Sequence, residues 1–127
     1  MNPRQEYKKL INSFKYAIEG IVSSFKTERN MKIHVLAMIV VIVLGFFFKL
    51  DKEEWCFIII AIVSVISAEL FNTAIETVVD MVSPERNPKA KLVKDIAAGA
   101  VFVVAIGAAI IGFIIFGPRV INLFFNN

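Results

Sequence analysis

Residues 67–80 read SAELFNTAIETVVD and place acidic side chains in a long apolar run without breaking its helical period. The twelve residues before them, 55–66, are almost entirely apolar. Residues spaced three or four positions apart lie on one face of a helix, so this segment predicts a helix with a single polar stripe. The stripe consists of Glu69, Asn72, Thr73, Glu76 and Asp80.

The depth of this stripe makes it unusual. If Trp55 marks one membrane interface, a rise of about 1.5 Å per residue puts Glu69 roughly 20 Å and Glu76 roughly 30 Å into a bilayer. An ionisable side chain at such a depth costs about 2.5 kcal/mol or more and normally marks a functional site. The plainer alternative for Asn72 and Thr73 is hydrogen bonding between helices, which is common in membrane bundles.

Composition and periodicity predict the class of protein. The chain has 127 residues, 57% of them hydrophobic, and a mean hydropathy of +0.72, which is far from a soluble composition. We expect one all-α integral membrane domain over residues 1–127. Its predicted parts are an amphipathic surface helix at about 6–26 and membrane-spanning helices at about 31–50, 55–82 and 90–116, the last ended by Gly117 and Pro118.

The distribution of charge predicts the orientation. Basic residues precede the first span and lie between the second and third, whereas the first connection and the C-terminal end carry few. By the positive-inside rule the N-terminus is cytoplasmic and the C-terminus lies outside. Basic residues that flank spans act as topology signals and contact anionic lipids, so nucleic acid is not an expected partner. The single cysteine, Cys56, can form no intramolecular disulfide, and we expect it to pack.

Charged residues gather at the predicted cytoplasmic membrane edge. Carboxylates there suit Mg²⁺, which is usually bound by one or two of them together with substrate phosphates, and lysines suit phosphate oxygens. We expect His34 to be an interfacial hydrogen-bonding residue rather than a metal ligand, because the chain has no second histidine. The pattern suggests transfer of a nucleotide phosphate to a hydroxyl presented from the bilayer, without a Walker A sequence. The acids are Glu28, Glu76, Asp80 and Asp95, and the bases are Arg86, Lys91 and Lys94.

Two sequence blocks carry a resemblance to a known family. Residues 69–80 fit E-x-x-N-x-A-x-E-x-x-x-D, and residues 94–100 read KDIAAGA. Together they resemble the signature blocks of the small prokaryotic lipid kinases, which include diacylglycerol kinase and undecaprenol kinase. The similarity extends from about Leu10 to Pro118. It implies a bacterial plasma-membrane enzyme, a homotrimer of three-span chains with an N-terminal surface helix, and active sites shared between neighbouring chains.

The resemblance also implies roles for individual residues. Glu69 matches the general base that accepts the proton of the lipid hydroxyl, and Asn72 would position the reacting groups. Glu69 and Gly99 would contact the lipid. Glu28 and Glu76 match the carboxylates that hold the Mg²⁺ of Mg-ATP. The matched ATP-binding residues are Lys9, Tyr16, Glu28, Glu76, Glu85, Arg86, Asn87, Lys94 and Asp95.

Three alternatives concern the function. Residues 27–34 and the Gly117-Pro118 pair resemble the Gram-positive branch, which favours undecaprenol over diacylglycerol as the substrate. Lys9 stands where enterobacterial diacylglycerol kinases carry an arginine, so the charge is kept but the bidentate fork is lost. A small proton-coupled transporter also fits an intramembrane glutamate. A non-catalytic helper subunit leaves the many charges at the membrane edge unexplained.

Overall fold

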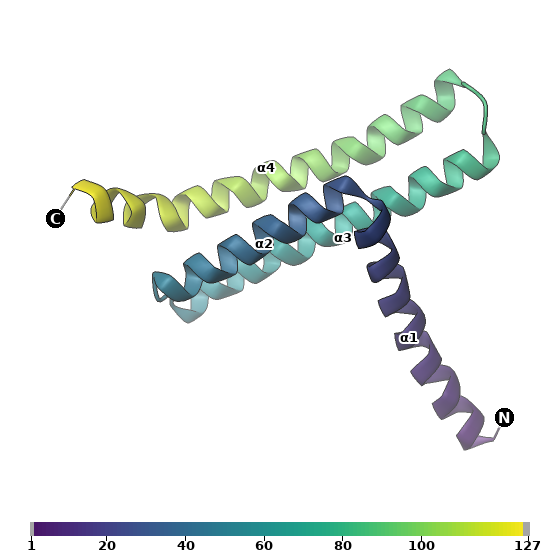
Figure 1. The fold of residues 1–127 in the computed structure, drawn as a ribbon, viewed down its shortest axis with the longest axis horizontal. Helices are drawn as coiled ribbons and strands as arrows, with labels where there is room; N and C mark the ends of the chain where they lie inside the picture. The colour runs from purple at the N-terminus through teal and green to yellow at the C-terminus, as the bar shows by residue number, and fades with distance from the viewer. Residues whose placement is uncertain (1, 126–127) are drawn as a thin grey trace.

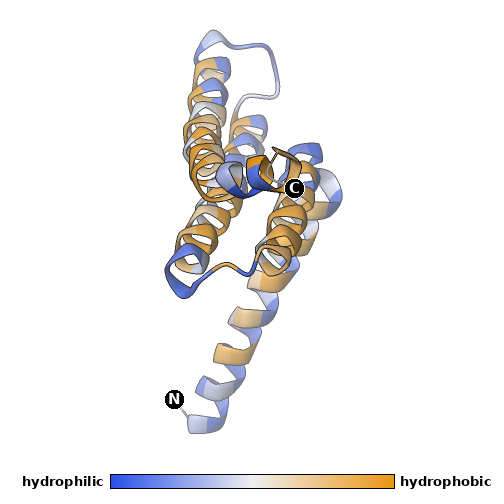
Figure 2. Ribbon diagram, turned by 90° about the vertical axis from the view of Figure 1, so that its left-hand side faces the viewer, coloured by the Kyte–Doolittle hydropathy of each residue, from blue (hydrophilic) through white to orange (hydrophobic). Residues whose placement is uncertain are grey.

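The computed structural model describes residues 2–125, which form four α-helices. The helices are α1 (Pro3–Thr27), α2 (Arg29–Phe47), α3 (Lys52–Val82) and α4 (Pro88–Phe125). The last three are long and apolar enough to cross a membrane, and Figure 2 shows their apolar lengths with polar residues gathered at the turns. The prediction of an all-α membrane protein is confirmed.

Helix α3 is the centre of the fold. It contacts both α2 and α4, and the three helices run alongside one another (Figure 1). Helix α1 leaves this bundle at a steep angle from the junction at Glu28, which is the single non-helical residue between α1 and α2. The α3–α4 hairpin extends past the start of α2 (Figure 1), so its far end lies beyond the cover of α2.

The turn between α2 and α3 closes the opposite end of the bundle. Lys49 has a φ of 52°, and the backbone N–H groups of Lys49 and Leu50 donate to the carbonyls of Phe46 and Gly45. This is the Schellman pattern that ends a helix. Asp51 then caps α3, because its side chain accepts from the N–H of Glu54 at 2.9 Å.

Gly45 permits a close approach of the two helices at this turn. A methyl group at Gly45 would lie 2.6 Å from Trp55 Cη2, so only a hydrogen fits there. Close by, the buried residues Leu50, Ile58, Ile115 and Phe116 form an apolar core cluster. This cluster lies at the turn end of the bundle, away from the acidic stripe, while Met31 at the start of α2 is buried separately.

Two expectations from the sequence were wrong. Helix α4 does not end at Gly117 and Pro118 but continues to Phe125 with Pro118 inside it. Proline removes one N–H, which would have donated to the carbonyl of Ile114, yet in an apolar setting the remaining backbone groups are better satisfied inside a helix than outside. Arg119 Nη1 donates to the neighbouring carbonyl of Ile115 at 2.6 Å. Cys56, which we expected to pack, is exposed.

Candidate functional site

The centre of the candidate site is a buried pair of polar residues on α3. Glu69 is 1% exposed and Asn72 is 6% exposed. They continue the buried face of α3 formed by Ile58, Ala61 and Val65, since all five follow the three- and four-residue spacing of one helix face. The same face that forms the core at one end of α3 thus carries a carboxylate and an amide toward the other end.

Helix α2 contributes a histidine to this pair. His34 Nε2 lies 3.9 Å from Glu69 Oε2, and the His34 side chain is only 20% exposed. From the sequence we expected His34 to be an interfacial hydrogen-bonding residue, and its proximity to Glu69 was not predicted. A signal was present: α2 and α3 form a helical hairpin, and counting back from its turn puts the two residues at similar depths.

Two atoms of the buried pair have unused hydrogen-bonding capacity. Glu69 Oε2 and Asn72 Oδ1 have no hydrogen-bond partner among the described residues 2–125. A buried polar group left in this state costs about 1–3 kcal/mol, and in native proteins it calls for a specific reason. The two residues lie three positions apart on the buried face of α3, and unpartnered acceptors suit a ligand that brings a hydroxyl group.

The neighbouring Thr73 has a structural role. Its hydroxyl donates to the carbonyl of Glu69 at 3.0 Å and lies 3.3 Å from the hydroxyl of the buried Ser24 on α1. The alternative of hydrogen bonding between helices is therefore confirmed for Thr73, whereas Asn72 Oδ1 makes no such bond within the described chain. The contact with Ser24 holds the end of α1 against α3.

A pocket between α1 and α3 collects two of the predicted ATP-binding residues. Tyr16 from α1 and Glu28 from the α1–α2 junction line it, facing Thr73 and Thr77 of α3. Glu76, one position before Thr77, is half-buried. Two carboxylates on adjoining elements suit Mg²⁺ bound together with phosphates, and no group of three or more possible metal ligands exists among residues 2–125.

A second pocket, which several charged residues line, lies at the turn between α3 and α4. It is lined by the predicted residues Glu85, Arg86, Asn87 and Lys94 together with Asp80. Lys94 Nζ donates to Asp80 Oδ1, which joins α4 to α3 beside the pocket. Asp95, one residue further on, pairs instead with Lys91 on the exposed side of α4.

Two other predicted residues lie apart from these pockets. Lys9 lines a separate hollow on the distal half of α1 with Gln5, Lys8 and Asn12. Gly99 lies on α4, where an added methyl group would meet nothing within 4 Å. A single chain therefore brings Tyr16 close to Glu28 and Lys94 close to residues 85–87, but it does not gather all the predicted nucleotide-binding residues in one place.

Comparison with known proteins identifies the family. The model of the prokaryotic diacylglycerol kinase family matches residues 15–116. The chain belongs to this family. Family membership makes it a lipid kinase, which is a phosphotransferase. All the predicted site residues except Lys9 lie within the matched range.

Relatives of this kinase carry two different names. An undecaprenol kinase of Bacillus subtilis is 42% identical over 91% of this chain and 94% of its own length. A diacylglycerol kinase of Synechocystis is 36% identical over 90% of this chain and 66% of its own length. A diacylglycerol kinase of Haemophilus influenzae is 36% identical over 74% of this chain and 80% of its own length.

Proposed function

We propose that this kinase transfers the γ-phosphate of ATP to the hydroxyl of undecaprenol and so produces undecaprenyl phosphate. The observation that carries the proposal is the buried carboxylate of Glu69, whose Oε2 has no partner among residues 2–125, in a chain of the lipid kinase family. Undecaprenol is favoured over diacylglycerol by the Gram-positive features of the sequence and by the 42% identical relative named undecaprenol kinase.

In the proposed reaction, the lipid hydroxyl oxygen attacks the γ-phosphorus of ATP. A new bond forms between these two atoms, the bond from the γ-phosphorus to the bridging oxygen of the β-phosphate breaks, and ADP leaves. Glu69 accepts the hydroxyl proton, because a carboxylate positioned with little water around it can act as a general base. Asn72, one turn further along α3, holds the hydroxyl in place.

The nucleotide is proposed to bind outside the apolar part of the bundle. Lys94 and residues 85–87 line the pocket at the α3–α4 turn, and Tyr16 lines the pocket between α1 and α3. These residues would contact ATP together with Asp95 and Lys9. Glu28 and Glu76 would hold Mg²⁺, which when bound neutralises charge on the phosphates. We propose that Gly99 of α4, where an added methyl group would meet nothing within 4 Å, contacts the lipid substrate.

The separation of these residues in one chain supports a shared site. We propose a homotrimer in which a neighbouring chain completes each nucleotide site. A mixture of Glu69→Gln and Lys94→Met chains tests this at an ATP concentration well below the KM of Lys94→Met, because activity rises only if the intact residues of two different chains can combine. Two variants whose low activity does not rise when they are assembled together would contradict a shared site.

The charge pattern supports the proposed orientation in a bacterial plasma membrane. α1 lies in the cytoplasmic interface as an amphipathic helix, and the turn at residues 83–87 faces the cytoplasm, while the C-terminus lies outside. Single cysteines placed at Glu85 and Lys52 of a Cys56→Ser chain test this in intact cells. Only the cysteine at position 52 should react with an impermeant thiol reagent added to the outside of the cells, and the reverse pattern would overturn the orientation.

Transfer of radiolabelled phosphate tests the activity and the substrate together. The purified protein in mixed micelles receives labelled Mg-ATP with undecaprenol, with diacylglycerol, or with both in competition. A much higher kcat/KM for undecaprenol supports the proposal. A higher kcat/KM for diacylglycerol would instead identify a diacylglycerol kinase with the same mechanism. The relatives named diacylglycerol kinase favour this alternative. Folded protein that labels neither lipid would overturn both.

A further inference from the structure

Helix α1 meets α3 through a contact between two hydroxyl groups. Ser24 is the single buried residue among residues 3–27 of α1, with an exposure of 4%. Its Oγ lies 3.3 Å from Thr73 Oγ1. Because α1 leaves the bundle at a steep angle (Figure 1), only its C-terminal part lies beside α3, and the contact is made there.

The direction of this hydrogen bond follows from the number of protons available. The Thr73 hydroxyl has one proton, which it donates to the carbonyl of Glu69 at 3.0 Å. Only the lone pairs of Thr73 Oγ1 remain for Ser24, so the Ser24 hydroxyl is the donor. Two hydrogen bonds in series therefore join α1 to the backbone of Glu69 through one threonine.

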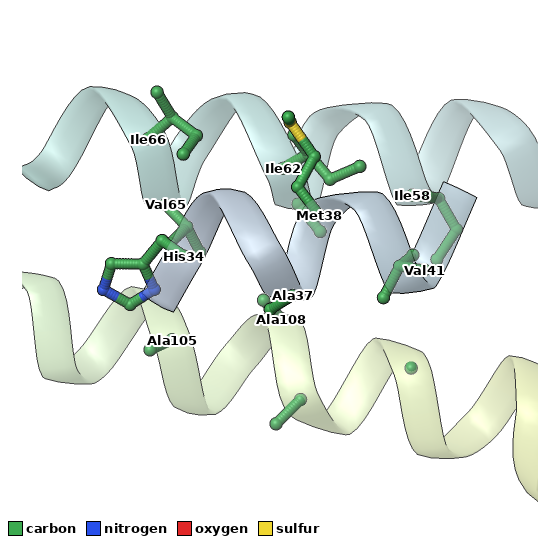
Figure 3. Close-up of a pocket in the computed structure, with 13 residues that line it drawn as sticks. His34, Ala37, Met38, Val41, Ile58, Ile62, Val65, Ile66, Ala105 and Ala108 are labelled. Atoms are coloured by element: carbon green, nitrogen blue, oxygen red, sulfur yellow. The ribbon is translucent and has the colours of Figure 1, made fainter. Parts of the chain in front are cut away.

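The contacts of α2 and α4 with α3 are of another kind. Figure 3 shows the groove where these three helices meet, and His34 is the only polar residue among the thirteen that line it. Apolar contact is non-directional, whereas a hydrogen bond weakens steeply when its length or angle changes. The bond between Ser24 and Thr73 can therefore fix a distance between two helices in a way that apolar contact alone does not.

The two hydroxyl groups lie close in the chain to the carboxylates proposed to hold the metal. The backbone N–H of Glu28 donates to the carbonyl of Ser24 at 2.9 Å, so Glu28 follows Ser24 by one helical turn. Glu76 follows Thr73 by three positions, which makes them neighbours on the surface of α3. Ser24, Glu28 and Thr73 line the same pocket. Each partner of the bond is thus about one turn away from one of the two carboxylates.

We propose that the hydrogen bond between Ser24 and Thr73 positions Glu28 relative to Glu76 and so adapts the site to Mg²⁺. Mg²⁺ requires near-ideal octahedral geometry with ligands at about 2.0–2.1 Å, whereas Ca²⁺ accepts flexible geometry at about 2.3–2.6 Å. A small shift of Glu28 would therefore disfavour Mg²⁺ more than Ca²⁺. Ser24 and Thr73 are positioning residues, because they act through the carboxylates. The inference deepens the proposed function and rests on it.

Binding of nucleotide in the absence of lipid substrate tests the positioning apart from catalysis. The purified protein in micelles without a lipid alcohol receives ATP with either Mg²⁺ or Ca²⁺, and equilibrium dialysis gives a Kd for each complex. Ser24→Ala should lower the preference for Mg-ATP over Ca-ATP about two- to tenfold, because one hydrogen bond is lost. Thr73→Val should lower it as well, whereas Thr73→Ser keeps the hydroxyl and should retain the wild-type preference.

The ratio of the two Kd values separates positioning from stability. Partial unfolding would weaken both complexes alike and leave the ratio unchanged. Ser13→Ala is the matched control, because its hydroxyl donates to the carbonyl of Lys9 within α1. In the double variant of Ser24→Ala and Thr73→Val, the ratio should fall no further than in Thr73→Val alone, since both changes remove the same bond. A wild-type ratio in Ser24→Ala, or an equal loss in Ser13→Ala, would overturn the inference.

Steady-state kinetics extends the test to turnover. Ser24→Ala should raise the KM for Mg-ATP about two- to tenfold and leave the KM for undecaprenol unchanged. An equal rise in both constants would assign the bond to the general stability of the fold and overturn its positioning role. Failure of the proposed function looks different: the wild-type protein would then bind Mg-ATP with a preference that depends on Ser24 but transfer no phosphate to undecaprenol.

Discussion

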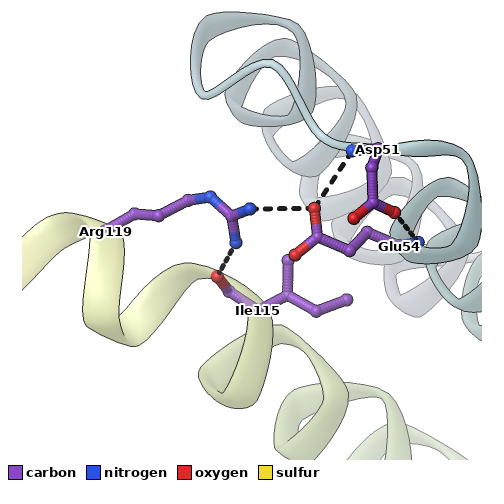
Figure 4. Close-up of polar contacts among 4 residues, drawn as sticks. All are labelled: Asp51, Glu54, Ile115 and Arg119. Atoms are coloured by element: carbon purple, nitrogen blue, oxygen red, sulfur yellow. Dashed lines mark hydrogen bonds and ion pairs between the residues drawn. The ribbon is translucent and has the colours of Figure 1, made fainter.

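The two ends of the bundle differ in how they treat polar groups. At the turn end, Glu54 Oε2 accepts from both Arg119 Nη2 at 2.8 Å and the backbone N–H of Asp51 at 3.1 Å, as Figure 4 shows. Around these bonds lies the apolar core. At the acidic end, Glu69 and Asn72 are more deeply buried than Glu54, yet each leaves an oxygen unpartnered among residues 2–125.

This difference suggests that the turn end stabilises the fold, whereas the acidic end carries the function. Satisfied polar groups and interlocked apolar side chains at the turn end stabilise the hairpin of α2 and α3 and attach α4 to it. Unsatisfied acceptors at the acidic end lower stability by about 1–3 kcal/mol each, and such groups are characteristic of sites that await a ligand. Substitutions at the acidic end should therefore change turnover, whereas those at the turn end should change the melting temperature.

The largest expected effect is that of Glu69→Gln. The amide cannot accept the hydroxyl proton, so phosphate transfer should fall about 10²- to 10⁴-fold while ATP binding persists. Transfer from labelled ATP gives the rate, and equilibrium binding of ATP gives the control. Glu54→Gln, the same change at the turn end, should leave the rate unaltered. Ordinary turnover in Glu69→Gln would remove this residue as the base.

Lys94→Met should have the next largest effect. Loss of the Lys94 side chain removes a charged hydrogen bond to phosphate, so the KM for ATP should rise about tenfold or more with little change in the KM for lipid. Steady-state kinetics with each substrate varied in turn measures both. Arg119→Met removes a cation from the opposite end of α4 and serves as the control. If Lys94→Met and Arg119→Met raise the KM for ATP equally, the effect of Lys94 cannot be assigned to a nucleotide site at the acidic end.

Gly45→Ala should destabilise the turn end. Its new methyl group would lie 2.6 Å from Trp55 Cη2, so the indole must move, at a cost of about 1–3 kcal/mol. Thermal unfolding in detergent measures this cost. Gly107→Ala is the matched control, because it meets nothing within 4 Å and should be neutral or slightly stabilising. A melting temperature unchanged by Gly45→Ala would show that Trp55 does not pack as the structure has it.

The smallest expected effect concerns the pair of Glu54 and Arg119. Both side chains are partly exposed, at 22% and 31%, so their coupling should be about 1 kcal/mol or less. A double-mutant cycle of Glu54→Gln and Arg119→Gln, read by thermal unfolding, measures it. High salt should weaken the coupling. A cycle that closes with no coupling would assign the role of Arg119 to its bond with the Ile115 carbonyl alone.

Much of the helical layout was predictable from the sequence. Long apolar runs, the prolines at positions 84 and 88 and the spacing of Glu69, Asn72 and Glu76 are local signals, and they predicted three apolar helices and a polar stripe. The error at Gly117 and Pro118 came from applying a rule of soluble helices to an apolar segment. The continuation of α4 depends on its apolar setting, in which backbone groups are better satisfied inside a helix than outside it.

The sequence by itself determined the family, the number of apolar helices and which residues share a face of α3, because helical periodicity is a property of one segment. Tertiary structure alone decided that His34 faces Glu69, that Thr73 meets Ser24, and that α2 and α4 leave a groove along α3. These contacts depend on how far each helix is rotated and shifted against the next. That choice is made by packing between segments distant in the chain, which no local pattern encodes.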